Sequence, residues 1–428
     1  MNQTSTFQAS TFQASTFQAS TFQASTVSAA PGTRLYFLDW VRILAFFVLV
    51  LYHVGMYYVS WGWHVKSAAA SSALEPLMML SSPWRLGLLF LVSGVAARFM
   101  LKKLGATTFM RRRSARLLIP LVFGMLVIVP PQPYFEIIEK IAYQGSYLDF
   151  MGQYLRAYHG FCNKDGCLAL PTWNHLWFVA YLWCYTIALA ALALACGARL
   201  DKLSQRLGQL LHGWKLFVLP VAALLALRVA LNHRFPSTHA LVDDWHNHAH
   251  YFLLFLAGAL LAGERQFWAR LEAARWFGLG LAAFGWCGIE VVIAWPDALV
   301  PPADLPYWRL AYSLCHSLMV WSAITAVCGF AHRHLQFDSA KRRYLTQAVF
   351  PVYILHQSLI VVLAHALKPA KLAPALEGPM LVVLTLAISF GAFEIIRRNR
   401  LLQTLFGATL TEAVAAAPAG ARAQPLAA

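Results

Sequence analysis

The chain has 428 residues, of which 59% are hydrophobic and only 12% are charged, and its formal net charge is +16. Because an average soluble domain is about a quarter charged, this composition excludes a disordered chain, a charged nucleic-acid-binding domain and most soluble enzymes. We therefore predict an all-α polytopic membrane protein, in which the excess of Lys and Arg lies on cytoplasmic loops and sets the topology.

Both ends of the chain are predicted to be tails outside the folded domain. Residues 5–24 are four tandem copies of STFQA, and this five-residue period matches no solenoid repeat. Residues 1–33 are therefore predicted to be a disordered low-complexity tail, without the basic and apolar regions of a signal peptide. Residues 408–428, rich in Ala and Pro, are predicted to be a second tail, which leaves a transmembrane domain over 34–407.

Ten apolar stretches between the tails are predicted to cross the membrane, because a spanning helix needs ~20 mostly apolar residues. When the spans alternate from a cytoplasmic N-terminus, most Lys and Arg fall on inside loops, as the positive-inside rule requires. We expect about ten transmembrane helices with both termini in the cytoplasm, the sixth being the shortest. The stretches are 36–60, 77–99, 117–133, 173–196, 216–232, 250–263, 276–295, 309–331, 347–367 and 379–396.

The longest loop that this alternation places outside, 134–172, is rich in Tyr and Phe. Such side chains are typical of a membrane-interface belt or of a platform for a flat sugar face, and the sequence favours neither. The loop also contains Cys162 and Cys167, which can form a disulfide if it faces an oxidising compartment. The other cysteines lie in or beside apolar runs, where we expect them to pack.

The first span contains Asp39, Arg42 and His53, and ionisable side chains inside a membrane are costly and usually functional. Asp39 and Arg42 lie three residues apart, so they share a helix face and can neutralise each other. Arg42 and His53 project from one stripe, ~16 Å apart along the axis. Asp39 lies ~21 Å from His53, so a carboxylate that orients this ring must come from another helix.

Arg85 in the second span adds another guanidinium, which favours a functional site over a snorkelling Arg42 and a structural His53. Ser93 and Gly94 follow, and such small residues let another helix or an elongated ligand approach the backbone. A basic cluster at the cytoplasmic end of the third span is typical of topology and anionic-lipid contact, or of a phosphate site. Its members are Arg111, Arg112, Arg113 and Arg116, with Lys102 and Lys103 nearby.

Other histidines lie in or beside the predicted spans. His175 opens the fourth span at a depth comparable to His53, and His356 lies in the ninth; each alone is more often structural than catalytic. His246 and His250 share a helix face, but no Glu completes a metalloprotease pattern, so we expect no metal. The sequence also has no P-loop, no GxSxG elbow and no dinucleotide-binding fingerprint.

Several motifs follow one another in a recognisable order. Arg42 and His53 are separated by ten residues in LDWVR…YH, and Arg85 with LLFLVSG, RRRSARLLIP, HLWF and VYILHQSLI come after them. This order and spacing resemble the acyltransferase-3 family of membrane O-acyltransferases over roughly residues 34–407. The WRLGLLFLVSG and YILHQ segments most resemble its glucan succinyltransferase branch. One departure is LVSG, where many members have an aromatic-rich FFxxSG.

The resemblance implies an acyltransferase, for groups other than aminoacyl, in the bacterial inner membrane. It would move an acetyl or succinyl group from cytoplasmic acyl-CoA to a hydroxyl of an extracytoplasmic glycan or lipid-linked sugar. We expect His53 to act as general base or as a covalent nucleophile, and Arg42, held by Asp39, to contact the donor. Arg85 would stabilise the oxyanion or bind a succinyl carboxylate, and His175 would orient the acceptor or act as a second acid or base. The expected binding residues are Arg111, Arg112, Arg113, Arg116 and Ser93 for CoA, and Trp177, Tyr353 and His356 for the acceptor.

Two other functions are compatible with these residues. Buried Arg, Asp and His also suit the proton relay of a proton-coupled transporter or glycan exporter. The absence of obvious paired halves with broken helices argues against transport, and a relay does not need Arg and His on one helix face. The other alternative is an inactive membrane scaffold, against which the intact Arg42 and His53 argue.

Overall fold

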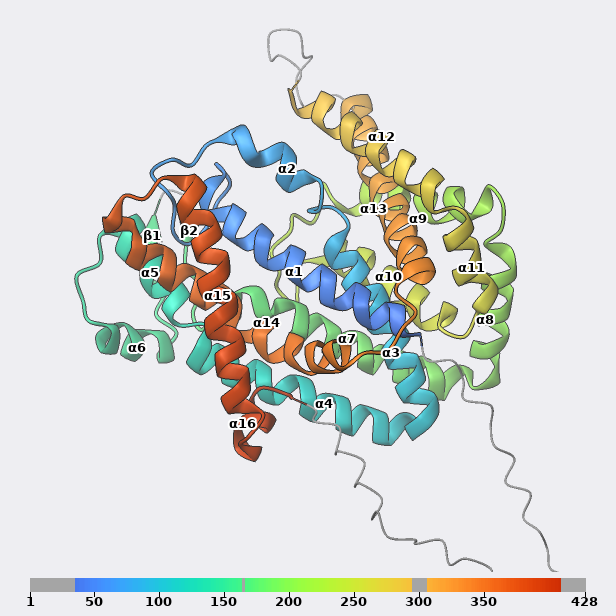
Figure 1. Ribbon diagram of the computed structural model, residues 1–428, viewed down its shortest axis with the longest axis horizontal. Coiled ribbons are helices and arrows are strands. Elements are labelled where there is room, and N and C mark those ends of the chain that lie inside the picture. The colour runs from blue at the N-terminus through green and yellow to red at the C-terminus, as the bar shows by residue number, and fades with distance from the viewer. Residues whose placement is uncertain (1–34, 164–165, 295–305, 409–428) are drawn as a thin grey trace, which may run out of the picture. The chain divides into compact units, whose positions relative to one another are not determined.

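The computed structural model describes residues 35–163, 166–294 and 306–408, and these residues are almost entirely helical. The predicted tails, 1–33 and 408–428, lie outside the described residues except for residue 408. The long helices are α1 (Tyr36–Tyr58), α3 (Arg85–Leu104), α4 (Ala106–Phe123), α7 (Trp177–Cys196), α9 (Lys215–Leu231), α10 (Trp245–Leu261), α12 (Arg275–Ala294), α13 (Pro306–His334), α14 (Ala340–Leu367) and α15 (Pro374–Ile396), drawn in Figure 1.

Shorter elements connect these helices. They are η1 (Ser72–Leu74), α2 (Glu75–Met79), the π-helical η2 (Gly124–Ile128), α5 (Pro131–Ile141), α6 (Tyr147–Leu155), η3 (Asn174–Leu176), α8 (Ala198–Leu210), α11 (Arg265–Ala273), η4 (Lys368–Ala370) and α16 (Arg400–Leu405). The strands β1 (Cys162–Asn163) and β2 (Gly166–Cys167) pair antiparallel.

Each predicted apolar stretch overlaps one of the long helices. In the described part of the chain, seven helical segments are long and apolar enough to cross a membrane, or eight when the bent pair α8 and α9 is one span. The protein is therefore a multi-pass membrane protein. α10 is not among these segments, because it has only 17 residues and contains three histidines. α3 is not among them either, because it contains two Arg and two Lys. The count of ten and the cytoplasmic termini stay predictions.

Two predicted spans are interrupted near prolines. The stretch predicted at 77–99 is broken by turns after α2, and Arg85 is the first residue of α3; Pro83 precedes it and cannot continue a regular helix ladder. α4 continues into η2, whose wider turn frees backbone carbonyls. Two of these accept side-chain hydrogen bonds: Met125 from Tyr154 at 2.8 Å and Ile128 from Ser358 at 2.6 Å.

The loop after α5 forms a small core of its own. Phe150 and Tyr154 are completely buried, and they pack with Ile137, Phe161 and Leu170. Most of the aromatic side chains predicted as an interfacial belt or a sugar platform are therefore used to pack this loop against itself. The Sγ atoms of Cys162 and Cys167 form a disulfide across β1 and β2, as the sequence allowed.

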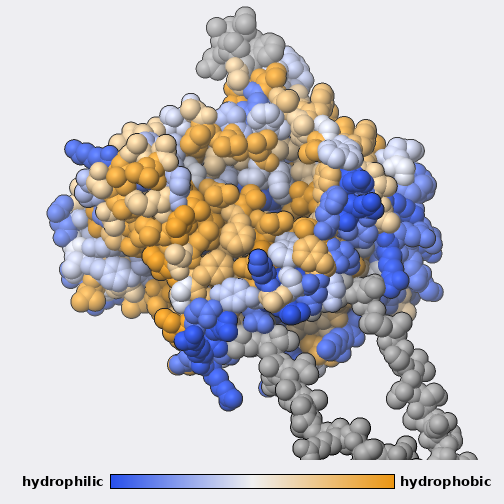
Figure 2. Space-filling model, viewed as in Figure 1, coloured by the Kyte–Doolittle hydropathy of each residue, from blue (hydrophilic) through white to orange (hydrophobic). Residues whose placement is uncertain are grey.

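Helix α1 packs against α3, α13, α14 and α15, so its polar stripe lies within the helical domain. The outer helix α15 exposes large apolar side chains, among them Leu376, Val383 and Ile395. Figure 2 shows apolar residues over α15 and the centre of the visible face, with hydrophilic residues gathered around α16. This distribution fits a surface of α15 that contacts lipid.

Glycines bring α3 and α10 into direct backbone contact. A Cβ atom on Gly94 would overlap the carbonyl oxygen of Phe255, and one on Gly258 would overlap that of Leu91. The small residues of the LVSG segment therefore admit a second helix. Ser93, one residue earlier on α3, faces a cavity instead.

We expect Gly94→Ala to lower the free energy of unfolding by at least about 1–3 kcal/mol, because the added methyl group meets backbone that cannot move aside. Gly280→Ala on α12 is the matched control: its Cβ meets nothing within 4 Å, and Ala favours a helix over Gly by ~1 kcal/mol. Thermal unfolding of the purified protein in detergent measures both. Equal stability of the two variants would contradict the close contact.

Candidate functional site

A cavity of about 800 Å³ runs beside α1 and is the space that most of the predicted site residues share. Its walls come from α1, α3, α4, α7, α10 and α14, from the loops that follow α1 and α9, and from the segments that precede α3 and α7. Arg42 and His53 both line it, so the polar stripe of α1 faces one interior space. The other predicted residues that line it are Arg85, Ser93, Arg113, Arg116, His175, Trp177 and Tyr353.

Four predicted site residues do not line this cavity. Arg111 and Arg112 are exposed, because they occupy a different face of α4 from Arg113 and Arg116, which lie one turn apart. Asp39 and His356 lie behind the cavity wall, and each contacts a residue on the other helix of the α1–α14 pair. The structure therefore gives these two side chains supporting positions.

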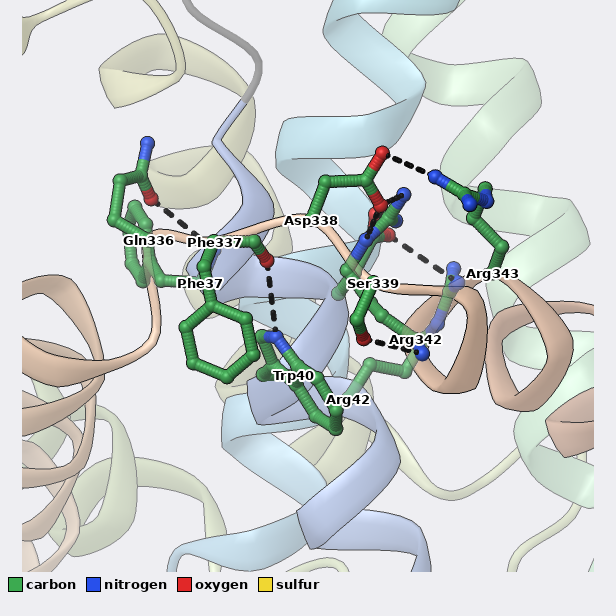
Figure 3. A network of polar contacts seen from close by, with 10 residues as sticks. Phe37, Trp40, Arg42, Gln336, Phe337, Asp338, Ser339, Arg342 and Arg343 are labelled. Carbon is green, nitrogen blue, oxygen red and sulfur yellow. Dashed lines mark hydrogen bonds and ion pairs between the residues drawn. The ribbon is translucent and has the colours of Figure 1, made fainter.

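Asp39 is part of an ion-pair network between the start of α1 and the start of α14. Figure 3 labels Arg42, Asp338, Arg342 and Arg343 of this network. The closest cationic partner of Asp39 is Arg342, which is only 2% exposed; Arg42 lies further away, with its Nη2 3.5 Å from Asp39 Oδ1. Arg342 also donates to Asp338 at 2.7 and 3.0 Å. Hydrogen bonds from Arg342 hold the pKa of the Asp338 carboxyl below its usual value. The expected Asp39–Arg42 ion pair is thus present, but Asp39 pairs more closely with Arg342 and so links α1 to α14.

One end of the cavity is cationic. Arg42, Arg113 and Arg116 line it together, and the Nε atom of Arg113 is buried without a hydrogen-bond partner in the described ranges. Guanidinium groups bind phosphate oxygens in a bidentate geometry. This end is therefore suited to an anion such as a phosphate.

His53 is oriented by another histidine. Its Nδ1 lies 2.8 Å from Nε2 of His356, and Nδ1 of His356 lies 2.6 Å from the carbonyl oxygen of Tyr353. Because a carbonyl oxygen only accepts, Nδ1 of His356 bears the proton, and its Nε2 must accept from Nδ1–H of His53. In neutral His53 the remaining nitrogen, Nε2, is then unprotonated. It has no hydrogen bond within the described part of the chain, so it is available as a base or a nucleophile.

His175 is held differently, because both of its ring nitrogens are occupied. Nε2 donates to the carbonyl oxygen of Ile354 at 3.1 Å, and Nδ1 accepts from the amide of Gln132 at 3.2 Å. The Tyr353 hydroxyl donates to the His175 carbonyl oxygen. This arrangement favours an orienting role for His175, since no ring nitrogen is left to exchange a proton.

Arg85 lies in the cavity wall as a buried cation. It is 4% exposed, its guanidinium carbon lies 3.2 Å from the centre of the Tyr52 ring, and its Nε and Nη1 are buried without hydrogen-bond partners among the described residues. An unpaired buried charge costs several kcal/mol. Its position beside an open cavity therefore points to an anionic group of a ligand.

A second oriented histidine, His64, lines the cavity beyond the end of α1. Its Nδ1 lies 2.6 Å from Oε2 of Glu136, and Lys140 binds the other carboxylate oxygen. Sequence reasoning missed this pair because His64 lies outside every apolar stretch and Glu136 lies within the segment predicted as a loop. The one available signal was WGWH, a histidine that follows two tryptophans just after the first span.

No cluster of three or more His, Cys, Asp or Glu side chains in the described ranges is arranged to hold a metal ion. His246 and His250, considered as a zinc pair, lie on α10 with ring centres 6.0 Å apart. The residues that gather around the main cavity are instead guanidinium, imidazole, amide and aromatic groups.

Comparison with known proteins gives one family and a set of distant relatives. Residues 35–394 match the family model of the acyltransferase-3 family, described as an acyltransferase domain. The chain is also similar to "Glucans biosynthesis protein C" of Salmonella schwarzengrund (strain CVM19633), Salmonella typhi and Salmonella typhimurium (strain LT2). Each is 22% identical over 387 residues, covering 89% of this chain and 96% of the relative. No solved structure matches the chain.

Proposed function

The chain belongs to the acyltransferase-3 family, and from this membership we propose that it transfers a short acyl group from cytoplasmic acyl-CoA to a hydroxyl of an extracytoplasmic glycan. The name of the relatives directs the proposal to a glucan acceptor, and their organisms direct it to a bacterial inner membrane. A lipid-linked sugar is the other acceptor that this chemistry admits.

The proposal rests on one observation: a single cavity is lined by the Arg cluster at one end and by an oriented His53 further along α1. The cluster of Arg42, Arg113 and Arg116 suits the phosphates of CoA. Arg42 and His53 lie ~16 Å apart along the helix, a distance suited to an extended pantetheine arm. The thioester would then lie beside the unprotonated nitrogen of His53.

In the reaction that we propose, Nε2 of His53 takes the proton from the acceptor hydroxyl as that oxygen attacks the thioester carbonyl carbon. The carbon–sulfur bond then breaks, and the leaving thiolate takes the proton from His53. His356 accepts the Nδ1–H bond throughout, which keeps the tautomer and stabilises the imidazolium. The same free Nε2 suits a covalent acyl-His53, which mass spectrometry of the acid-quenched protein distinguishes from base catalysis.

The unpaired guanidinium of Arg85 favours succinyl over acetyl as the transferred group. A succinyl thioester has a distal carboxylate, which would pair with the buried guanidinium of Arg85, whose Nε and Nη1 have no partner among the described residues. An acetyl group leaves this cation uncompensated. Stabilisation of the thioester oxyanion is the alternative role of Arg85, and it would not discriminate between donors.

We expect His356→Phe to lower kcat by roughly 10²-fold or more while the KM for acyl-CoA changes little, because His53 loses the acceptor that fixes its tautomer. In His356→Gln the amide oxygen can accept the same hydrogen bond and should restore part of the activity. His365→Phe, on the same helix but outside the cavity, is the control. Equal kcat in the two Phe variants would show that His356 does not orient His53.

The function itself is tested with purified protein, labelled succinyl-CoA or acetyl-CoA, and glucan. The proposal predicts release of free CoA that depends on glucan, together with label on the glucan. A proton-coupled transporter or glycan exporter would leave the thioester intact. If neither membranes that contain the protein nor the purified protein release CoA in the presence of glucan, the proposed function is contradicted.

A further inference from the structure

The cavity differs in chemistry between its two ends. The end near the start of α1 is cationic, whereas a group of aromatic and neutral hydrogen-bonding side chains lines the cavity around Trp63, next to His53. We call this second region the aromatic end. It consists of Trp63, His64, Thr172, Trp173, Asn174 and Gln357.

A chain of hydrogen bonds at the aromatic end holds Gln357 with one polar atom unused. Glu136 accepts from Nδ1–H of His64 at 2.6 Å, so Nε2 of His64 bears the lone pair and faces the amide nitrogen of Gln357 at 3.2 Å. That amide nitrogen also donates to Gln132 at 2.9 Å. Both N–H bonds of Gln357 are thereby directed at protein atoms, and its Oε1 has no hydrogen-bond partner in the part of the chain that the structure describes.

Trp63 separates this region from the reactive histidine. Its ring stacks on His53 with centres 5.5 Å apart and lies 5.1 Å from His64. Its indole N–H is buried without a partner in the described ranges. Aromatic faces bordered by a few fixed polar groups form the usual wall of a small-molecule site, and a neutral polyol supplies hydroxyls for the unused acceptor and donor.

We propose that Trp63, His64 and Gln357 form the subsite that binds a neutral sugar ring of the acceptor, and that Glu136 is the positioning residue for His64. This inference rests on the proposed acyl transfer. The sugar ring lies against Trp63, one hydroxyl donates to Gln357 Oε1, and another accepts from the indole N–H of Trp63. His64 Nε2 accepts from the Gln357 amide and so fixes the direction of Oε1. The hydroxyl to be acylated then lies next to His53.

Steady-state kinetics of glucan acylation, with acyl-CoA and glucan varied separately, test this subsite. Gln357→Leu and Trp63→Ala are expected to raise the KM for glucan at least 10-fold (about 1.4 kcal/mol), with the KM for acyl-CoA and the affinity for CoA unchanged. Glu136→Gln, which keeps a hydrogen-bond acceptor, should raise the glucan KM less than His64→Phe does. Trp61→Ala and His159→Phe, both outside the cavity, are the matched controls.

Each outcome decides the question. An unchanged glucan KM in both Gln357→Leu and Trp63→Ala, with normal wild-type turnover, overturns the subsite and leaves the proposed function intact. A loss of CoA affinity in the same variants also overturns it, because the aromatic end would then serve the donor. A wild-type protein that never cleaves acyl-CoA overturns the proposed function and the subsite together.

Discussion

His53→Ala is expected to abolish acyl transfer, with kcat lower by at least roughly 10³-fold, while the protein still inserts into the membrane and binds CoA. The structure leaves His53 Nε2 as the unprotonated nitrogen beside the cavity, because Nδ1–H is directed at His356. The other imidazoles that line the cavity in the described ranges are engaged elsewhere. His175 has both nitrogens occupied, His64 lies beyond Trp63, and His239 stacks on Trp177 with its Nε2 3.3 Å from the Ser237 hydroxyl.

The measurement is release of free CoA in the presence of glucan, with CoA affinity determined on the same preparation. His365→Ala, which removes a histidine of α14 that does not line the cavity, controls for the general effect of losing an imidazole. If His53→Ala retains wild-type turnover, His53 is neither the base nor the nucleophile.

The second large effect concerns the choice of donor. Arg85→Met should lower kcat/KM for succinyl-CoA by roughly 10²-fold or more, because losing one partner of a buried charge pair typically costs 2–5 kcal/mol. The kcat/KM for acetyl-CoA should fall far less, because acetyl-CoA has no distal carboxylate. The variant should remain folded, since Met replaces a buried cation that has no ion-pair partner among the described residues and so relieves a desolvation cost.

Arg85→Lys separates charge from geometry, because Lys keeps the positive charge but lacks the planar fork that binds a carboxylate bidentately. Partial retention of succinyl-CoA activity in this variant would fit a carboxylate partner. An equal loss with both donors in Arg85→Met would instead assign Arg85 to the oxyanion of the thioester.

Periodicity alone was sufficient to place Arg42 and His53 on one wall. Both lie in a single helix, whose geometry fixes their relative direction, and composition was sufficient to predict an all-helical membrane protein. The apolar stretches also located the helices. The break between α2 and α3 was missed, although Ser81, Ser82 and Pro83 lie inside the predicted stretch and such a run is typical of a turn.

The contacts between segments that are distant in the sequence could not be predicted from the sequence. The partners of Asp39 and His53 both lie 303 residues away on α14, and which side chains meet depends on the rotation of α14 against α1. His356 was predicted to bind the acceptor, whereas the structure places it on His53. The Arg cluster was predicted as a unit, but only the two members one turn apart on α4, Arg113 and Arg116, face the cavity.

In the proposed reaction, a thioester that enters at the Arg cluster meets an acceptor that arrives from the aromatic end, on the opposite side of the membrane. Reconstitution into sealed vesicles tests this most directly, with glucan enclosed and labelled succinyl-CoA added only outside. We expect labelled glucan inside intact vesicles and free CoA outside, and we expect both to be absent with His53→Ala. Label that reaches glucan only after detergent opens the vesicles would contradict transfer across the membrane.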